Sequence, residues 1–279
     1  MKYNNKLFGT KAHPIRPSKL DKVAKCQVLG LMLVMEADDE LGGKAAQTGQ
    51  LVHVGAATFH NEPDPERKVQ AGLVELQSSL SKFPLGDIAE AEKHYLCYVA
   101  DPRNANAKVI AVEKNVEFEL PPHPDDPTGE NIYITGTLDQ IRQLDDGSMR
   151  IYDIKTGAPT GWHMIHNYSY QLAAYLLAAR ANGFPVDNSV IIRTQGYRVR
   201  GAVLPEPNGI FFPTHLSVGR SLYLMSRIRQ AVASIRKGEI EFGPGDQCTY
   251  CPLNGIESCM PWAETVLGFE PDRKLISLF

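Results

Sequence analysis

The sequence predicts an α/β protein in which a helical N-terminal part precedes a mixed sheet (an α+β arrangement). Two observations predict this class. Apolar residues recur at helical spacing through much of the first hundred residues, and after residue 107 the pattern changes to the alternation typical of strands. Three alternating segments are followed by a helix, a further strand and a long helix. This order favours a sheet with helices packed against it.

The N-terminal part is expected to be helical over 18–100. Ser18 can cap a helix over 18–36, and apolar residues at helical spacing indicate another over 43–61. An Asp-Pro pair opens a helix over 64–81. Residues 87–100 suit a fourth helix, although LCYVA within them would also suit a strand.

The sheet core is expected over 107–200. Strands are predicted over 107–120, 131–144 and 148–157, and a DDG turn at 145–147 joins the last two into a hairpin. The elements expected after this hairpin are a helix over 163–182, a strand pair or strand and loop over 188–201, and a C-terminal helix with a cysteine-rich segment over 215–262. We expect the whole chain, 1–279, to form one domain.

Composition leaves the partner open. The chain has 279 residues, 43% of them hydrophobic, and a formal net charge of −3, so any contact with nucleic acid must come from a local basic patch. No apolar run reaches membrane-span length, and the N-terminus lacks the apolar region of a secretory signal. The expected location is the cytoplasm, with no membrane partner.

The predicted hairpin brings two acids together. With 145–147 as the turn and 144 opposite 148, partner positions add up to 292, so Asp139 faces Asp153. Alternation along the strand places Asp153 and Lys155 on one face. Opposed carboxylates are unfavourable unless a cation neutralises them, and a divalent metal ion does this better than Lys155 alone. The alternative is a solvated sheet face, but apolar neighbours such as Ile154 argue against it. A register slip of one residue would send Asp139 to the other face.

Four short motifs around these acids resemble the PD-(D/E)XK nuclease superfamily. Within it, the chain is similar to the RecB-like exonucleases with an iron–sulfur cluster, a group that includes CRISPR-associated enzymes, and a phage-encoded relative would also fit. The matching residues, in chain order, are Gly49 with His53, Gly136 with Asp139, Asp153 with Lys155, Thr156 and Gly157, and Gln171 with Tyr175. Leu138 stands before Asp139, where the superfamily name has proline.

The resemblance implies a restriction-endonuclease-like core and a metal-dependent DNA nuclease. It implies that Mg²⁺ or Mn²⁺ is held by His53, Asp139, Asp153 and the carbonyl of Ile154, ligand types that suit these ions. Lys155 would orient the attacking water, while Gln171 and Tyr175 would support Lys155 or contact the DNA backbone. His60 is a weaker rival ligand. The expected activity is exonucleolytic cleavage of single-stranded DNA in recombination, repair, or CRISPR or phage DNA processing.

The cysteines indicate a second metal centre. Their odd number, five, and the missing export signal argue against a disulfide framework. The sequence CTYCPLNGIESC gathers Cys248, Cys251 and Cys259. The resemblance implies that these three cysteines and Cys26 are the ligands of a [4Fe–4S] cluster. Such a cluster would link the C-terminal segment to the N-terminal helix. Structural zinc is the alternative, because four thiolates also bind Zn²⁺.

Basic residues with an interleaved tyrosine are candidates for DNA contact. They are Arg193, Tyr197, Arg198 and Arg200, and further cations such as Arg236 lie on the last helix. A solvated or strand-edge role is the alternative for each. A second hypothesis for the whole chain is a DNA-end-binding or partner-docking module for a helicase, recombinase or integrase with little cleavage. An RNA nuclease is a third. The chain contains no Walker A loop, and the sequence leaves homo-oligomer formation open.

Overall fold

The computed structural model describes residues 4–35, 42–157, 163–194, 198–199, 202–203, 210–241 and 243. The chain divides into two compact units. The first comprises 1–38, 117–135 and 222–279, and the second comprises 39–116 and 136–221. The expected single nuclease domain over 1–279 stays a prediction.

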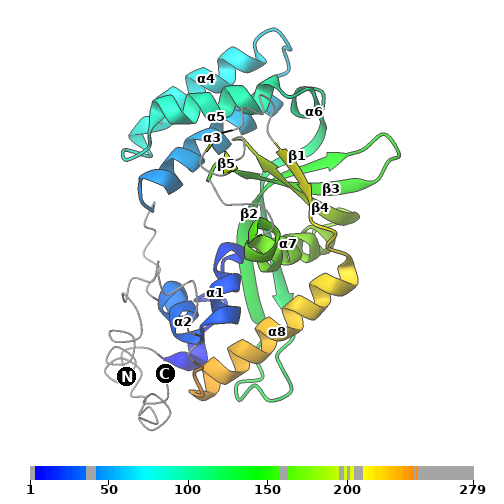
Figure 1. Cartoon of the computed structure of the whole chain (residues 1–279). Coiled ribbons are helices and arrows are strands. Elements are labelled where there is room, and N and C mark those ends of the chain that lie inside the picture. Colours follow the sequence, from blue (N-terminus) through cyan, green and yellow to red (C-terminus); the bar gives the residue numbers. More distant parts are fainter. Residues whose placement is uncertain are drawn as a thin grey trace. The chain divides into compact units, whose positions relative to one another are not determined.

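The element order follows the predicted one closely (Figure 1). The helices of the described chain are α1 Leu20–Lys25, α2 Gln27–Met35, α3 Lys44–Asn61, α4 Lys68–Ser78, α5 Ile88–Ala100, α6 Pro102–Ala105, α7 His163–Ala181 and α8 Val218–Lys237, with the short 3₁₀ turns η1 Asn5–Leu7, η2 Pro17–Lys19 and η3 Ser79–Ser81. The strands are β1 Lys108–Leu120, β2 Ile132–Gln143, β3 Met149–Lys155, β4 Val186–Arg193, β5 Arg198–Val199, β6 Ala202–Val203 and β7 Ile210–Pro213.

A mixed sheet with the order β1-β2-β3-β4-β7 confirms the predicted fold class. β3 pairs antiparallel with β2 and parallel with β4, and β4 pairs antiparallel with β7. A parallel pair needs a long crossover, and α7 supplies it between β3 and β4. Asp153 and Lys155 therefore lie on a strand that has partners on both sides.

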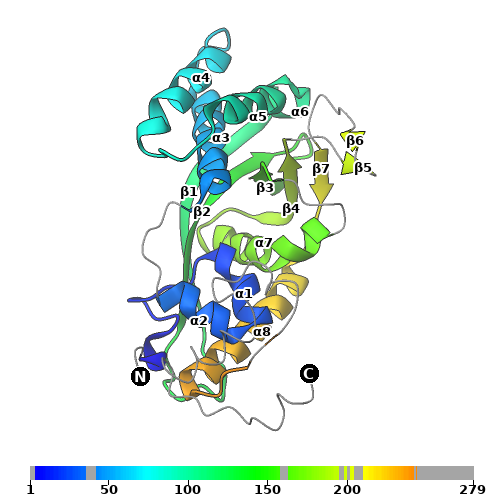
Figure 2. The same ribbon diagram turned by 60° about the vertical axis from the view of Figure 1, so that its left-hand side comes forward.

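A helical layer of α3, α4 and α5 packs on one face of β3 and β4 in the second unit (Figures 1 and 2). The sheet contributes alternate residues to this core, Tyr152 and Ile154 from β3 and Val190 and Ile192 from β4. The intervening residues of β3, among them Asp153, therefore face away from this layer.

The predicted single helix over 18–36 is wrong, because the chain breaks at Cys26 into α1 and α2. Cys26 is extended, with φ −152° and ψ 104°. The break lets α2 fold back on α1, where a Cβ on Gly30 would lie 2.7 Å from the Val23 Cα. The next residue, Gln27, pairs with Glu241 through a backbone hydrogen bond of 3.2 Å and a side-chain hydrogen bond of 3.0 Å.

Arg236 is a structural residue of the first unit, which corrects its interpretation as a DNA contact. Its Nη1 lies 2.7 Å from Asp126 Oδ2, and both side chains are fully buried. It also donates to the backbone carbonyls of Phe8 and Glu130. A buried guanidinium that is paired in this way holds the N-terminal segment and the loop before β2 against α8.

None of the helices in the described ranges combines the length and apolarity that crossing a bilayer requires.

Candidate functional site

The β2–β3 hairpin has the register that the sequence predicts. Gln140 pairs with Tyr152 and Gln143 with Met149, so partner numbers add up to 292. The turn closes through a 2.9 Å hydrogen bond from the Leu144 amide to the Ser148 carbonyl, and Gly147 takes the left-handed conformation at φ 82°. Asp139 and Asp153 follow directly beyond these paired residues.

Asp139 is held by the backbone of the neighbouring strand. Its Oδ2 accepts a hydrogen bond of 2.6 Å from the amide of Ile154, and only 7% of the residue is exposed. The amide and carbonyl of one strand residue point toward the same neighbouring strand. The Lys155 carbonyl accepts from Thr194 on the β4 side, so the Ile154 carbonyl is directed toward β2. This direction suits the expected role of that carbonyl as a metal ligand.

Asp153 and Lys155 form an ion pair in which the carboxylate is buried and the lysine is partly buried. Lys155 Nζ lies 2.8 Å from Asp153 Oδ2 and 3.0 Å from Oδ1, and only 1% of the Asp153 side chain is exposed. The ring of Tyr168, on α7, lies with its centroid 4.8 Å from the same Nζ. Sequence reasoning missed Tyr168, although its position three residues before Gln171 places it on the same helical face.

Gln171 contacts Asp153 directly. Its link to Lys155 is therefore indirect, because Asp153 lies between them as the ion-pair partner of Lys155. Its Nε2 donates to Asp153 Oδ1 at 3.3 Å, and it is itself buried. Tyr175, one turn further along α7, is also buried and hydrogen-bonds to Gln171. Two hydrogen bonds in series therefore connect Tyr175 through Gln171 to the carboxylate of Asp153.

His53 reaches the site from α3 because Gly49 lets that helix approach the end of β3. A Cβ on Gly49 would lie 3.1 Å from Thr156 Oγ1, a tight contact. One helical turn later, His53 Nδ1 lies 3.4 Å from Asp139 Oδ1. The G-x-x-x-H spacing thus has a geometric reason: the glycine permits the approach and the histidine uses it.

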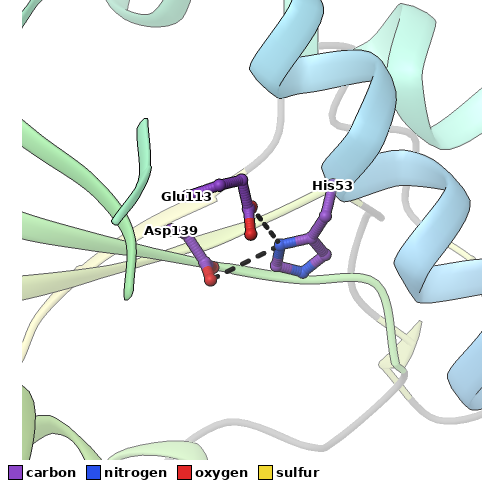
Figure 3. A group of neighbouring side chains, drawn as sticks. All are labelled: His53, Glu113 and Asp139. Atoms are coloured by element: carbon purple, nitrogen blue, oxygen red, sulfur yellow. Dashed lines mark hydrogen bonds and ion pairs between the residues drawn. The ribbon is translucent and has the colours of Figure 1, made fainter. Parts of the chain in front are cut away.

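Glu113 on β1 joins this cluster, and sequence reasoning missed it. Its Oε1 lies 3.3 Å from His53 Nδ1 (Figure 3). One ligand atom from each of His53, Glu113 and Asp139 lies within 4.8 Å of the others. None of the four motifs includes Glu113, so its place in the cluster comes from the packing of β1 on β2.

Two side-chain hydrogen bonds indicate how β1 and β2 are aligned. Thr137 donates to Asn115 at 2.8 Å, and Asn131, just before β2, donates to Glu119 at 2.7 Å. Rising numbers on one strand meet falling numbers on the other, so the two strands run in opposite directions. This alignment brings Glu113 near Asp139, which lies two residues beyond Thr137.

Burial and neighbouring charges control the ionisation of these groups. Burial raises the pKa of Asp139, and burial together with the charge of Asp139 lifts the pKa of Asp153 to about 6, against the opposing charge of Lys155. Burial alone would lower the pKa of His53, but Asp139 and Glu113 raise it to about 9. Burial opposes the charge of Lys155 as well, yet Asp153 and Asp139 raise its pKa overall. The carboxylates that stabilise a proton on His53 would also attract a metal cation to the same place.

His60 is not part of this cluster, which corrects its place as a rival ligand. Its Nε2 lies 2.7 Å from the Tyr98 hydroxyl. That hydroxyl oxygen also accepts from Gln140 at 2.7 Å and from Arg142 at 3.0 Å. The phenolic hydrogen is thus donated to His60, which needs a neutral imidazole. Burial, followed by the charge of Arg142, lowers the pKa of His60 to about 3.

Of the four predicted DNA-contact residues, only Arg193 has a described side chain. Arg193 pairs with Lys155 in the β3–β4 register and is only 3% exposed, which disagrees with a surface contact to phosphate. Arg198 lies in β5, where only the backbone is described. Tyr197 and Arg200 lie outside the described residues.

Of the predicted cluster cysteines, only Cys26 lies in the described part of the chain. It is a buried free thiol between α1 and α2. Cys248, Cys251 and Cys259 lie outside the described residues.

Comparisons with known proteins point to one superfamily. The family model for the PD-(D/E)XK nuclease superfamily matches residues 17–256. The crystal structure of SSO0001 resembles this chain at a TM-score of 0.39 and 14% identity, over 83% of this chain and 91% of that one. Comparison with curated proteins found no match.

Proposed function

Since the chain belongs to the PD-(D/E)XK nuclease superfamily, we propose that it is a metal-dependent deoxyribonuclease that degrades single-stranded DNA from an end. The observation that carries this proposal is the arrangement of Asp139, Asp153 and Lys155 on one hairpin, with His53 at 3.4 Å from Asp139. Two buried acids beside a partly buried lysine are costly for stability, and such costs are typical of active sites.

The donor set fits a divalent ion such as Mn²⁺ or Mg²⁺. Carboxylate oxygens suit both ions, and an imidazole nitrogen suits Mn²⁺ better. We assign His53, Asp139, Asp153 and the carbonyl of Ile154 as the residues that would hold the ion. When bound, the ion would polarise the scissile phosphate and lower the pKa of a bound water.

The chain's own side chains have separate tasks in this mechanism. Lys155 carries a positive charge that Asp153 fixes from 2.8 Å, so it can stabilise charge that develops on the phosphate and orient the attacking water. Gln171 holds Asp153 in turn. The Tyr168 ring lies against the ammonium group and favours its positive charge. The Ile154 amide fixes Asp139.

Cleavage of labelled DNA tests the proposal. Single strands with open or blocked ends, and matching duplexes, are incubated with wild type, Lys155→Ala and the surface control Lys93→Ala in Mn²⁺ or Mg²⁺. We expect wild type and Lys93→Ala to degrade open single strands and Lys155→Ala to leave them intact. Equal products from wild type and Lys155→Ala would contradict the assignment. DNA binding without turnover in wild type would favour an end-binding module instead.

We also propose a [4Fe–4S] cluster on Cys26, Cys248, Cys251 and Cys259. The described chain supports this because Gly243 lies against the backbone of Lys25 so closely that a Cβ would not fit. Cys248 follows Gly243 by five positions, a span that an extended chain covers in at most about 18 Å. The chain therefore passes Cys26 shortly before the cysteine-rich segment begins.

Metal analysis of anaerobically purified protein tests the cluster. We expect a brown protein with about four iron atoms per chain in wild type and in the control Cys97→Ser, and loss of iron in Cys26→Ser. Stoichiometric zinc in a colourless protein would replace the cluster with a structural zinc site.

A further inference from the structure

Glu113 meets the site from a strand that none of the four motifs includes. Its Oε1 and Asp139 Oδ1 lie 3.3 Å and 3.4 Å from the same atom, His53 Nδ1. Among the residues that the structure describes, one ligand atom from each of these three groups lies within 4.8 Å of the others (Figure 3). Asp153 is engaged differently, because both of its oxygens face Lys155.

The ionised side chains of the site carry a net charge of −2 when His53 is neutral. Glu113, Asp139 and Asp153 are three carboxylates, and Lys155 compensates one of them. With a neutral His53, two negative charges remain, which is the charge that one divalent ion neutralises. Without Glu113 the same site would retain a single uncompensated negative charge.

Glu113 is also open to solvent, in contrast to the other acids. Its side chain is 37% exposed, against 9% for Asp139 and 1% for Asp153. An ion that enters from solvent would meet this carboxylate at the rim, with His53 and Asp139 behind it. Partial exposure also makes its desolvation on metal binding less costly than that of the buried acids.

We propose that Glu113 is a further ligand of the divalent ion, binding it together with His53 and Asp139. This inference rests on the proposed function, since it names an additional residue for the same metal site. Glu113 would add one carboxylate to the four ligands assigned above, next to His53 and Asp139, whose ligand atoms already lie within 4.8 Å of its own.

Titration of Mn²⁺ into the full-length protein, with free Mn²⁺ followed by electron paramagnetic resonance, tests the proposal without any cleavage reaction. We expect Glu113→Gln to weaken Mn²⁺ binding at least about 10-fold. Glu113→Asp, which keeps the carboxylate, should recover part of the affinity. The control Glu117→Gln changes another exposed glutamate of β1 and should bind within about twofold of wild type.

Two results would overturn the ligand assignment: Glu113→Gln binding Mn²⁺ as tightly as wild type, or wild type binding none. Thermal unfolding of each variant without metal shows whether it is folded, and Glu113→Asp provides the comparison if Glu113→Gln is not. The outcomes separate the two proposals. Binding that depends on Glu113 in a protein that cuts no DNA supports the ligand and rejects the nuclease. DNA cleavage by wild type, together with an unchanged Mn²⁺ affinity in Glu113→Gln, supports the nuclease and rejects the ligand.

Discussion

The β2–β3 hairpin and the β1–β2 pair both bring an acid to the metal site, but only the first does so through a short turn. Residues 144–148 separate β2 from β3, whereas 121–131 separate β1 from β2. A tight turn restricts the strands that it joins to very few registers, and a long loop permits many. The hairpin therefore places Asp153 opposite Asp139 by local rules, while Glu113 arrives there by tertiary packing.

The two regions also differ in how they use a left-handed backbone. Gly147 occupies φ 82° in the hairpin turn, and Glu113 occupies φ 44° in β1. Glycine tolerates this region without steric cost, whereas glutamate is strained in it. Residues 113, 114 and 115 are exposed in succession, which interrupts the alternation of β1 at the same place. The hairpin is thus built for stability, and β1 carries strain beside the site.

The largest expected effect separates chemistry on the hairpin from metal binding on β1. Lys155→Ala should lower the single-turnover cleavage rate on the order of 10³-fold at every Mn²⁺ concentration, because a fixed charge at the reacting phosphate is lost. Glu113→Gln should lower the rate mainly at low Mn²⁺, since excess metal restores occupancy. Rates measured across a Mn²⁺ series check this. Parallel losses in both variants at saturating Mn²⁺ would remove the distinction.

Sequence reasoning succeeded where short-range rules decide the structure. The DDG turn alone predicts the register that aligns Asp139 with Asp153. It failed where the deciding contact lies far along the chain. Arg236 is buried because Asp126 meets it from 110 residues away. The helix predicted across Cys26 breaks there, and the next residue, Gln27, pairs with Glu241 from 214 residues away.

Glu113 illustrates the same limit at the site. In its sequence neighbourhood, AVEKNVEFEL, apolar residues alternate from Val116 onward, while 113–115 are three polar residues in a row. This interruption does not identify a metal ligand, and Glu117 and Glu119 are further acids of the same strand. The only signal that could have found it is the order of charges along β1 combined with the β1–β2 register, and the loop over 121–131 leaves that register undetermined.

The next effect concerns the hydrogen bonds around the Tyr98 hydroxyl, to which Gln140 and Arg142 of β2 donate and which bonds to a neutral His60. Its folded pKa of about 3 lies below its ordinary value of 6.5, so the unfolded chain binds the proton first as pH falls. This contribution to stability is complete above 6.5 and declines as pH falls from there toward 3. Between about pH 7 and pH 5 we expect a loss of about 2 kcal/mol in the free energy of unfolding.

Urea unfolding of wild type and His60→Gln at both pH values isolates this loss. Glutamine can still accept from Tyr98 but does not titrate, so the variant should lack that part of the pH dependence. The cations that act on His60 are Arg142 and Lys68, and neither arginine nor lysine side chains change charge in this range. Equal pH slopes in the two proteins would show that His60 does not carry the effect.

A smaller effect tests the turn itself. Gly147→Ala should cost about 1 kcal/mol of stability, because an L residue is unfavourable at φ 82°. A Cβ at this position meets nothing within 4 Å, so the cost is confined to the backbone. Gly219→Ala is the matched control, since its Cβ is equally unobstructed but lies in α8. In the helix, alanine should raise the free energy of unfolding by about 0.5 kcal/mol. If chemical unfolding showed that both substitutions change the free energy of unfolding in the same direction, a left-handed backbone at Gly147 would be contradicted.

The smallest effect asks whether β1 is strained at Glu113 in the same sense. Glu113→Gly and Glu113→Ala both remove the carboxylate and differ only in the Cβ, so their comparison cancels the change in charge. At φ 44° the glycine variant should be more stable than the alanine variant by about 1 kcal/mol when both are unfolded in EDTA. At Glu117, in a regular part of the strand, the order should reverse, because glycine weakens a strand interior by about 0.5–1 kcal/mol relative to alanine. The same order at both positions would mean that Glu113 sits in ordinary strand backbone, and the contrast with the unstrained hairpin would then rest on register alone.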